Sequence, residues 1–74
     1  TEDYVSAKPI LEYLINQHPT DFQLYLYYGT LCMELNMLEE AERNFEFIIN
    51  SESSQLSQQA LWYKSLNYLI NIKN

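Results

Sequence analysis

The sequence predicts a small all-α domain, and three observations lead to this fold class. Hydrophobic residues make up 47% of the 74 residues and charged residues 19%, a balance typical of a chain that folds around a core. Gly occurs once and Pro twice, so the residues that interrupt helices are sparse. No segment shows the alternation of apolar and polar side chains that indicates a half-buried strand. We therefore expect about four helices joined by short turns, which places consecutive helices antiparallel.

The first helix is predicted over residues 3–17, where apolar side chains recur at helical spacing. Pro9 lies inside its first turns, where the loss of a backbone donor costs least. Pro19 is expected to end the helix, because the residue before a proline is pushed out of the helical conformation.

The second helix is predicted to begin at Thr20, which precedes Gln23 with the spacing of a capping box. Cys32 falls on the apolar stripe of this helix, and we expect it to be a small buried side chain rather than a nucleophile. Asn36 is expected to end the helix, since asparagine tolerates the left-handed conformation that follows many helices.

The third and fourth helices are predicted over residues 38–50 and 55–72. Glutamates in the first turn of the third helix suit the positive end of its dipole. The loop between the two helices is rich in serine, and either Ser53 or Ser54 could cap the fourth helix.

An internal repeat connects these helices. The interval from Ala7 to Ala41 equals the interval from Leu11 to Phe45. The shared interval matches the period of about 34 residues of the tetratricopeptide repeat, a helix–turn–helix unit with small and aromatic residues at fixed positions.

The remaining positions of that repeat pattern are also present. The first helix of the middle unit carries its aromatic and small residues at Tyr25, Tyr28, Gly29 and Cys32, and Ser65 follows Gly29 at a similar interval, lengthened by two positions. A glycine inside a helix costs about 1 kcal/mol, so Gly29 needs a packing reason. We expect Gly29 and Ala41 to let two helix backbones approach closely.

The chain thus resembles tetratricopeptide-repeat proteins over nearly its whole length. The resemblance divides a single domain, residues 1–74, into three parts: the second helix of one repeat over 1–19, a complete repeat over 20–54, and the first helix of the next over 55–74. It implies antiparallel helix hairpins stacked as a short right-handed solenoid. The fourth helix is similar to helices of bacterial, especially Bacteroidetes-type, repeat proteins.

Composition excludes several classes of function. Ten acidic and four basic side chains give a formal charge of -6, which argues against nucleic-acid binding because phosphates are bound by clustered Lys and Arg. One Cys and one His do not make a zinc site, and no pair of titratable residues suggests catalysis. We expect no enzyme activity, cofactor or metal.

The apolar runs are too short for a membrane helix, which needs about 20 residues. The chain has no signal segment and no initiator Met, so we expect a soluble piece of a longer protein. The sequence leaves the choice between cytoplasm and periplasm open.

In the family, the first helices of successive repeats line a concave groove that receives a peptide or helix. The resemblance places nine side chains there: Gln23, Leu26, Thr30, Met33 and Glu34 on the second helix, and Gln59, Trp62, Leu66 and Leu69 on the fourth. Alternatively, the last three of these pack against a neighbouring helix. For Trp62 both interpretations stay open, and for Leu66 we favour packing.

The function expected from the resemblance is protein–protein interaction or scaffolding through this groove. Two alternatives are a helical-repeat RNA-binding module, which would need basic residues along the groove, and a purely structural segment of a bacterial envelope or regulatory protein. Repeat proteins bury each apolar face against a neighbour. A homodimer through the last helix is therefore also expected.

Overall fold

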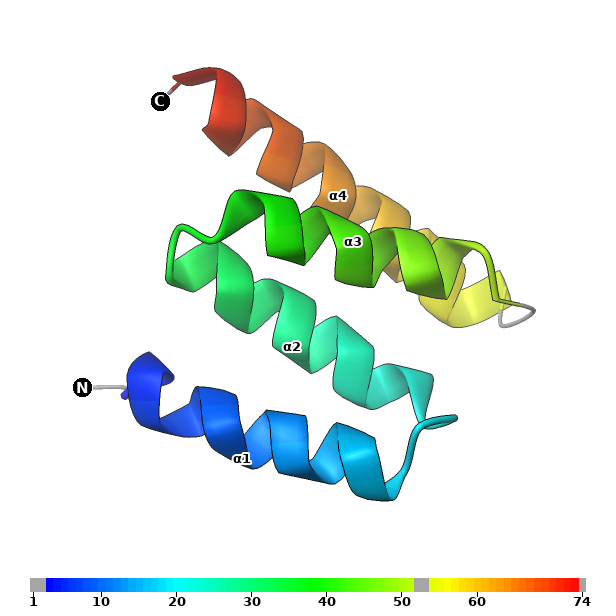
Figure 1. Cartoon of the computed structure of the whole chain (residues 1–74). Coiled ribbons are helices and arrows are strands. Elements are labelled where there is room, and N and C mark those ends of the chain that lie inside the picture. Colours follow the sequence, from blue (N-terminus) through cyan, green and yellow to red (C-terminus); the bar gives the residue numbers. More distant parts are fainter. Residues whose placement is uncertain (1–2, 52–53, 74) are drawn as a thin grey trace.

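The computed structural model describes residues 3–51 and 54–73, and the secondary structure of this part of the chain is entirely helical. The four helices are α1 (Tyr4–Gln17), α2 (Phe22–Glu34), α3 (Leu38–Ile49) and α4 (Ser54–Lys73). Each helix packs against the next along the chain, and α2 also contacts α4. Figure 1 shows the resulting stack of hairpins, with α1 at one end and α4 at the other. The prediction of an all-α fold built from helix hairpins is confirmed.

Helix α1 begins one residue later than predicted, because Asp3 is its cap. The Asp3 carboxylate accepts hydrogen bonds from the Ser6 amide at 3.0 Å and from the Ser6 hydroxyl at 2.6 Å. Pro9 is the sixth residue of the helix, which lies beyond the amides that are free at any helix start. Its missing donor therefore removes one hydrogen bond to the Val5 carbonyl, and its cost is higher than the sequence suggested.

Helix α2 does not begin at the predicted capping box. Its cap is Asp21, whose carboxylate accepts a hydrogen bond from the Gln23 amide at 3.2 Å. Thr20 instead lies in the turn before the helix, and the Tyr25 hydroxyl donates to the Pro19 carbonyl across that turn at 3.0 Å. The prediction of Thr20 as the cap is wrong because the next residue along the chain supplies the acceptor.

The end of α2 confirms the role predicted for Asn36. This residue has a φ of 61°, and the Met37 amide donates to the Cys32 carbonyl at 2.8 Å while the Asn36 amide donates to that of Met33 at 3.0 Å. These two bonds define a Schellman motif, in which a left-handed residue satisfies the last carbonyls of a helix.

Helices α3 and α4 follow the predicted ranges closely. α3 has its C-cap at Asn50 and carries Glu39 and Glu40 in its first turn. α4 starts at Ser54 and ends at Lys73, one residue beyond each predicted end. Of the two predicted caps, Ser53 lies outside the described residues.

The core lies between α2, α3 and α4, and Phe45 stands at its centre. Phe45 and Ala41 of α3 have no exposed surface. A Cβ added to Gly29 would stand only 2.5 Å from Cε1 of Phe45, so the Phe45 ring lies directly against the glycine and occupies the space of a larger side chain. On its other side the Phe45 ring stacks on Tyr63 of α4 at 5.9 Å between centroids. The close contact predicted for Gly29 is present, and it is made with the Phe45 ring; Ala41 is buried in the core.

One polar side chain is enclosed with this core. Asn67 of α4 is 3% exposed, and its Nδ2 donates to the Leu38 carbonyl at the start of α3 at 2.8 Å. Its Oδ1 has no hydrogen-bond partner within the described chain. The hydrogen bond of the Asn67 Nδ2 fixes the position of α4 on α3. The unpaired Oδ1 carries a desolvation cost, because it is removed from water without a new partner.

Candidate functional site

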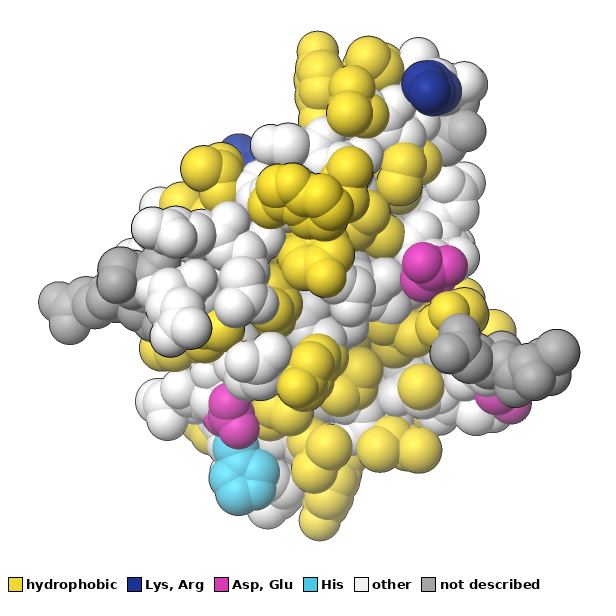
Figure 2. All heavy atoms as spheres, turned by 180° about the vertical axis from the view of Figure 1, so that it is seen from behind, with side chains coloured by type: hydrophobic (Ala, Val, Ile, Leu, Met, Phe, Trp, Pro, Cys, Tyr) yellow, Lys and Arg dark blue, Asp and Glu magenta, His cyan; other side chains and the backbone are white. Residues whose placement is uncertain are grey.

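The nine residues predicted to line a groove lie on α2 and α4, the two helices that meet on the side of the stack away from α3. In Figure 1, α3 stands in front of α4. Figure 2 shows the opposite side, where hydrophobic side chains form a band from α4 across to α1 and charged side chains stand mainly at its edges.

Four of the nine side chains are exposed on these helices. Trp62 is 61% exposed and Leu69 is half exposed, while Gln59 and Glu34 are also open to solvent. Trp62 meets Tyr63 edge to face, with 5.4 Å between ring centroids. A large exposed aromatic beside an aliphatic side chain is a surface that another protein can cover.

One of the nine is misplaced by the sequence prediction. Leu26 is only 4% exposed and belongs to the buried cluster, so it is a core residue and lines no groove. The reason is the direct packing of α2 on α4, which encloses the side chains between them. The remaining four, Gln23, Thr30, Met33 and Leu66, are half-buried.

Helix α4 exposes several large apolar side chains between its polar residues. It buries Ala60 and Asn67, whereas six large apolar side chains, Leu61, Trp62, Tyr68, Leu69, Ile70 and Ile72, are between a third and two thirds exposed. Large apolar side chains gathered on one helix are typical of a surface that another element or protein covers. No other helix of the described chain covers these six.

The net charge of α4 has the opposite sign to that of the rest of the chain. Residues 1–54 hold all ten acidic and two basic side chains, a formal charge of -8, whereas residues 55–74 hold two basic and no acidic side chains, a formal charge of +2. The two basic residues of α4 are Lys64 and Lys73. Lys64 forms an ion pair with Glu46 of α3 at 3.3 Å.

Each end of the stack carries a shallow apolar hollow. The first, of about 350 Å³, lies between α1 and α2 and is lined by Tyr4, Ala7, Leu11, Tyr27, Thr30, Leu31 and Glu34. The second, of about 420 Å³, lies on α4 alone and is lined by Leu61, Lys64, Ser65, Tyr68 and Leu69. We call them the α1 hollow and the α4 hollow.

A polar cluster that sequence reasoning missed joins three helices. The Tyr28 hydroxyl lies 2.7 Å from Oε2 of Glu12 on α1 and 2.8 Å from Oε2 of Glu40 on α3. One hydroxyl has one proton, so it donates to one carboxylate at a time. Lys8 bonds the same Glu12 oxygen at 2.8 Å and lies 5.6 Å from the centroid of the Tyr28 ring. From the sequence, the glutamates in the first turn of α3 are expected only to suit the helix dipole.

The surroundings shift the proton affinities in this cluster. The hydrogen bond from Lys8, and then that from Tyr28, holds the pKa of Glu12 below its usual range. Burial, followed by the two carboxylates, raises the pKa of the Tyr28 hydroxyl well above its usual range. The phenol therefore stays protonated and acts as a hydrogen-bond donor that links helices, rather than as a phenolate.

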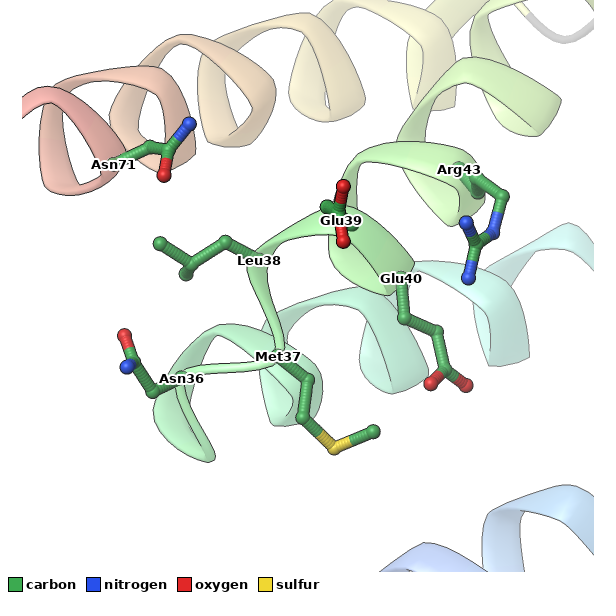
Figure 3. Close-up of a pocket in the computed structure, with 7 residues that line it drawn as sticks. All are labelled: Asn36, Met37, Leu38, Glu39, Glu40, Arg43 and Asn71. Atoms are coloured by element: carbon green, nitrogen blue, oxygen red, sulfur yellow. The ribbon is translucent and has the colours of Figure 1, made fainter.

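A third hollow, of about 470 Å³, lies at the α2–α3 turn and is mainly polar. Figure 3 shows Leu38 between Asn36 and Asn71, whereas Glu40 and Arg43 extend away from α4. These polar groups do not converge on one point, and Glu40 is already bound by Tyr28. The hollow therefore defines no ligand position.

Other candidate groups also occupy ordinary positions. Cys32 is fully buried, and burial, together with the charge of Glu40, raises the pKa of its thiol to about 11. His18 is an exposed residue after α1. Over residues 3–51 and 54–73 no group of three or more His, Cys, Asp or Glu side chains is arranged to hold a metal ion. None of the helices described combines the length and hydrophobicity needed to cross a bilayer.

Comparison of the chain with protein-family models, with curated proteins and with solved structures finds no match.

Proposed function

We propose that this chain is a tetratricopeptide-like repeat module, part of a right-handed solenoid, that binds a protein or peptide partner on the side shared by α2 and α4. The observation that carries the proposal is the exposure of Trp62, at 61%, on a helix packed beside α2. The equal spacing of Ala7 from Ala41 and of Leu11 from Phe45, with the close contact of Gly29 and Phe45, supports the family assignment.

A partner with apolar anchors fits this side best. Tryptophan contributes more than most residues to protein interfaces, because its large rigid ring is removed from water on binding. Leu69 adds apolar area, and Gln59 and Glu34 supply polar groups of the kind found at an interface rim. The module would act by holding its partner in place, without catalysis.

The alternative of RNA binding has less support. None of the nine predicted groove residues is Lys or Arg, and the chain carries a formal charge of -6. A phosphate backbone would be repelled by such a chain. A purely structural role, in which a neighbouring helix covers α4, is distinguished from partner binding by the following experiment.

Random peptides displayed on phage are selected against the folded chain, and binders are expected to carry aliphatic or aromatic anchors. Trp62 is the single tryptophan, so a change in its fluorescence on titration reports binding close to this side chain on α4. Trp62→Ala is expected to weaken the selected peptides about 30-fold or more, the loss of about 2 kcal/mol typical of an interface hot spot.

Tyr13→Ala is the matched control, since Tyr13 is a similarly exposed aromatic on α1, at 62%. This variant is expected to bind the same peptides unchanged. Peptides that lose affinity equally with both variants, or a selection that yields no binder sensitive to Trp62, would refute the proposal in favour of a structural role.

A further inference from the structure

The two ends of the stack carry residues that correspond to the two sides of the contact between α2 and α3. One side of that contact is repeated on α1 and the other side on α4. In the α2–α3 hairpin, Phe45 is the eighth residue of α3 and packs against Gly29 of α2. Leu11 is the eighth residue of α1 and corresponds to Phe45 in the repeat, while Ser65 of α4 corresponds to Gly29. Leu11 lines the α1 hollow and Ser65 lines the α4 hollow.

The α1 hollow also has the right surroundings for a helix of this kind. Within the chain, α2 packs against both α3 and α4. The α1 hollow is bordered by α1 on one side and by Tyr27 and Leu31 of α2 on the other. A further helix seated in this hollow would touch both α1 and α2. Its contact with α1 would resemble the contact of α2 with α3, and its contact with α2 would resemble the contact between α2 and α4.

Charge favours α4 as that helix. The charged residue that borders the α1 hollow is Glu34, and the charged residue that borders the α4 hollow is Lys64. Residues 55–74 carry a formal charge of +2 and the residues before them -8. The opposite net charges of the two segments steer their encounter and disfavour the pairing of like ends, and Lys64 borders the α4 hollow while pairing with Glu46 of its own chain.

We infer that α4 of one copy packs into the α1 hollow of a second copy, so that α4 and the second copy's α1 complete a hairpin like that of α2 and α3. The contact is heterologous, because it joins two different surfaces, and each added copy leaves one free end of each kind. Assembly is therefore head to tail. The two proposals share Leu69 and Glu34, but Trp62 lines neither hollow, so loss of peptide binding in Trp62→Ala and loss of assembly in a variant with a blocked hollow are separate results.

The experiment blocks the two ends separately. Tyr27→Glu places a charge in the α1 hollow, and Tyr68→Glu places one in the α4 hollow. Both tyrosines are more than half exposed, at 53% and 64%, so the folded chain tolerates the change. Burying an unpaired carboxylate in the contact is costly. Tyr13→Glu, on the exposed surface of α1 and outside both hollows, is the control.

Sedimentation equilibrium measures the mass. The unmodified chain and Tyr13→Glu are expected to gain mass steadily with concentration, without a plateau at the dimer. Each blocked variant alone is expected to keep the mass of one chain, and an equal mixture of the two to reach twice that mass, because one intact α1 hollow and one intact α4 end remain. Circular dichroism checks that each variant is folded.

Three results would overturn the inference. An unmodified chain that stays monomeric throughout means that a further segment or another protein covers these ends. Blocked variants that do not pair when mixed, although the unmodified chain assembles, mean that two α4 helices pack on each other symmetrically. Assembly of Tyr27→Glu alone leads to the same conclusion.

Discussion

The contact between Gly29 and Phe45 leads to a prediction whose sign depends on the partner residue. In most helices, replacing an interior glycine by alanine gains about 1 kcal/mol of helix propensity. Here the added Cβ would stand 2.5 Å from Cε1 and 2.9 Å from Cζ of the Phe45 ring. Carbon atoms in contact ordinarily lie about 3.5–4.0 Å apart, so Gly29→Ala forces the ring or the helix to move.

The ring has little room to move. Phe45 has no exposed surface and is stacked on Tyr63 at 5.9 Å. Overpacking of this kind costs about 1–3 kcal/mol. After the helix gain of about 1 kcal/mol, Gly29→Ala is expected to lower the free energy of unfolding by up to about 2 kcal/mol. Gly29→Leu, with more atoms to place, is expected to lose about 1–3 kcal/mol.

A double-mutant cycle isolates the contact. Phe45→Leu removes the two ring atoms closest to the new Cβ, so in that background Gly29→Ala is expected to be neutral or to stabilise by up to about 1 kcal/mol. Urea unfolding followed by circular dichroism gives each free energy. Gln58→Ala, at an exposed position on α4, should have the same effect in both backgrounds. Equal effects of Gly29→Ala in the two backgrounds would refute the close approach of α2 and α3.

Three further predictions concern buried or bonded polar groups. Cys32, whose pKa is raised to about 11 by burial, should react with a thiol reagent at neutral pH far more slowly than in urea; equal rates would mean that it is exposed. Asn67→Leu should change the free energy of unfolding in urea by no more than about 1 kcal/mol, because it loses the bond to Leu38 but removes the unpaired Oδ1. Asn67→Asp should cost about 3 kcal/mol or more by burying an unpaired charge; a loss as small as that of the leucine variant would contradict the burial. Because the pKa of Glu12 is lowered in the folded chain, its ionised carboxylate stabilises the fold. This contribution is complete above the ordinary pKa of a glutamate and is lost as the pH falls through the lowered pKa. Glu12→Gln should therefore flatten the acid side of a plot of stability against pH, and an unchanged slope would exclude the link.

The helices could be predicted from the sequence because each depends on neighbours a few residues away. Apolar spacing placed all four, and Asn36 marked the end of α2 through its tolerance of a positive φ, found at 61°. The start of α2 was harder, because Thr20 and Asp21 are adjacent acceptors and only the folded turn selects between them.

The misplaced and missed residues depend on contacts between distant segments. Helical spacing gave Leu26 a place on an exposed stripe, and only the packing of α4 on α2 shows that it is enclosed. Tyr28 meets Glu12 and Glu40, which lie 16 and 12 positions away in the chain. No local pattern marks such a meeting. The side chain of Tyr28 looked apolar in the sequence, and its hydroxyl gained a role only in three dimensions.

The construction of α1 has a consequence for local unfolding. This helix has no buried residue, lacks one backbone hydrogen bond at Pro9, and packs only on α2 within the described chain. Local opening requires little free energy where few apolar contacts are lost. The amides of α1 should therefore exchange with deuterium through a partial opening that leaves α2, α3 and α4 folded, and Tyr28 would lose Glu12 but keep Glu40 in that open form. A molecule bound in the α1 hollow would slow this exchange without touching the central helices, so the exchange rate of one helix would report occupancy of that end.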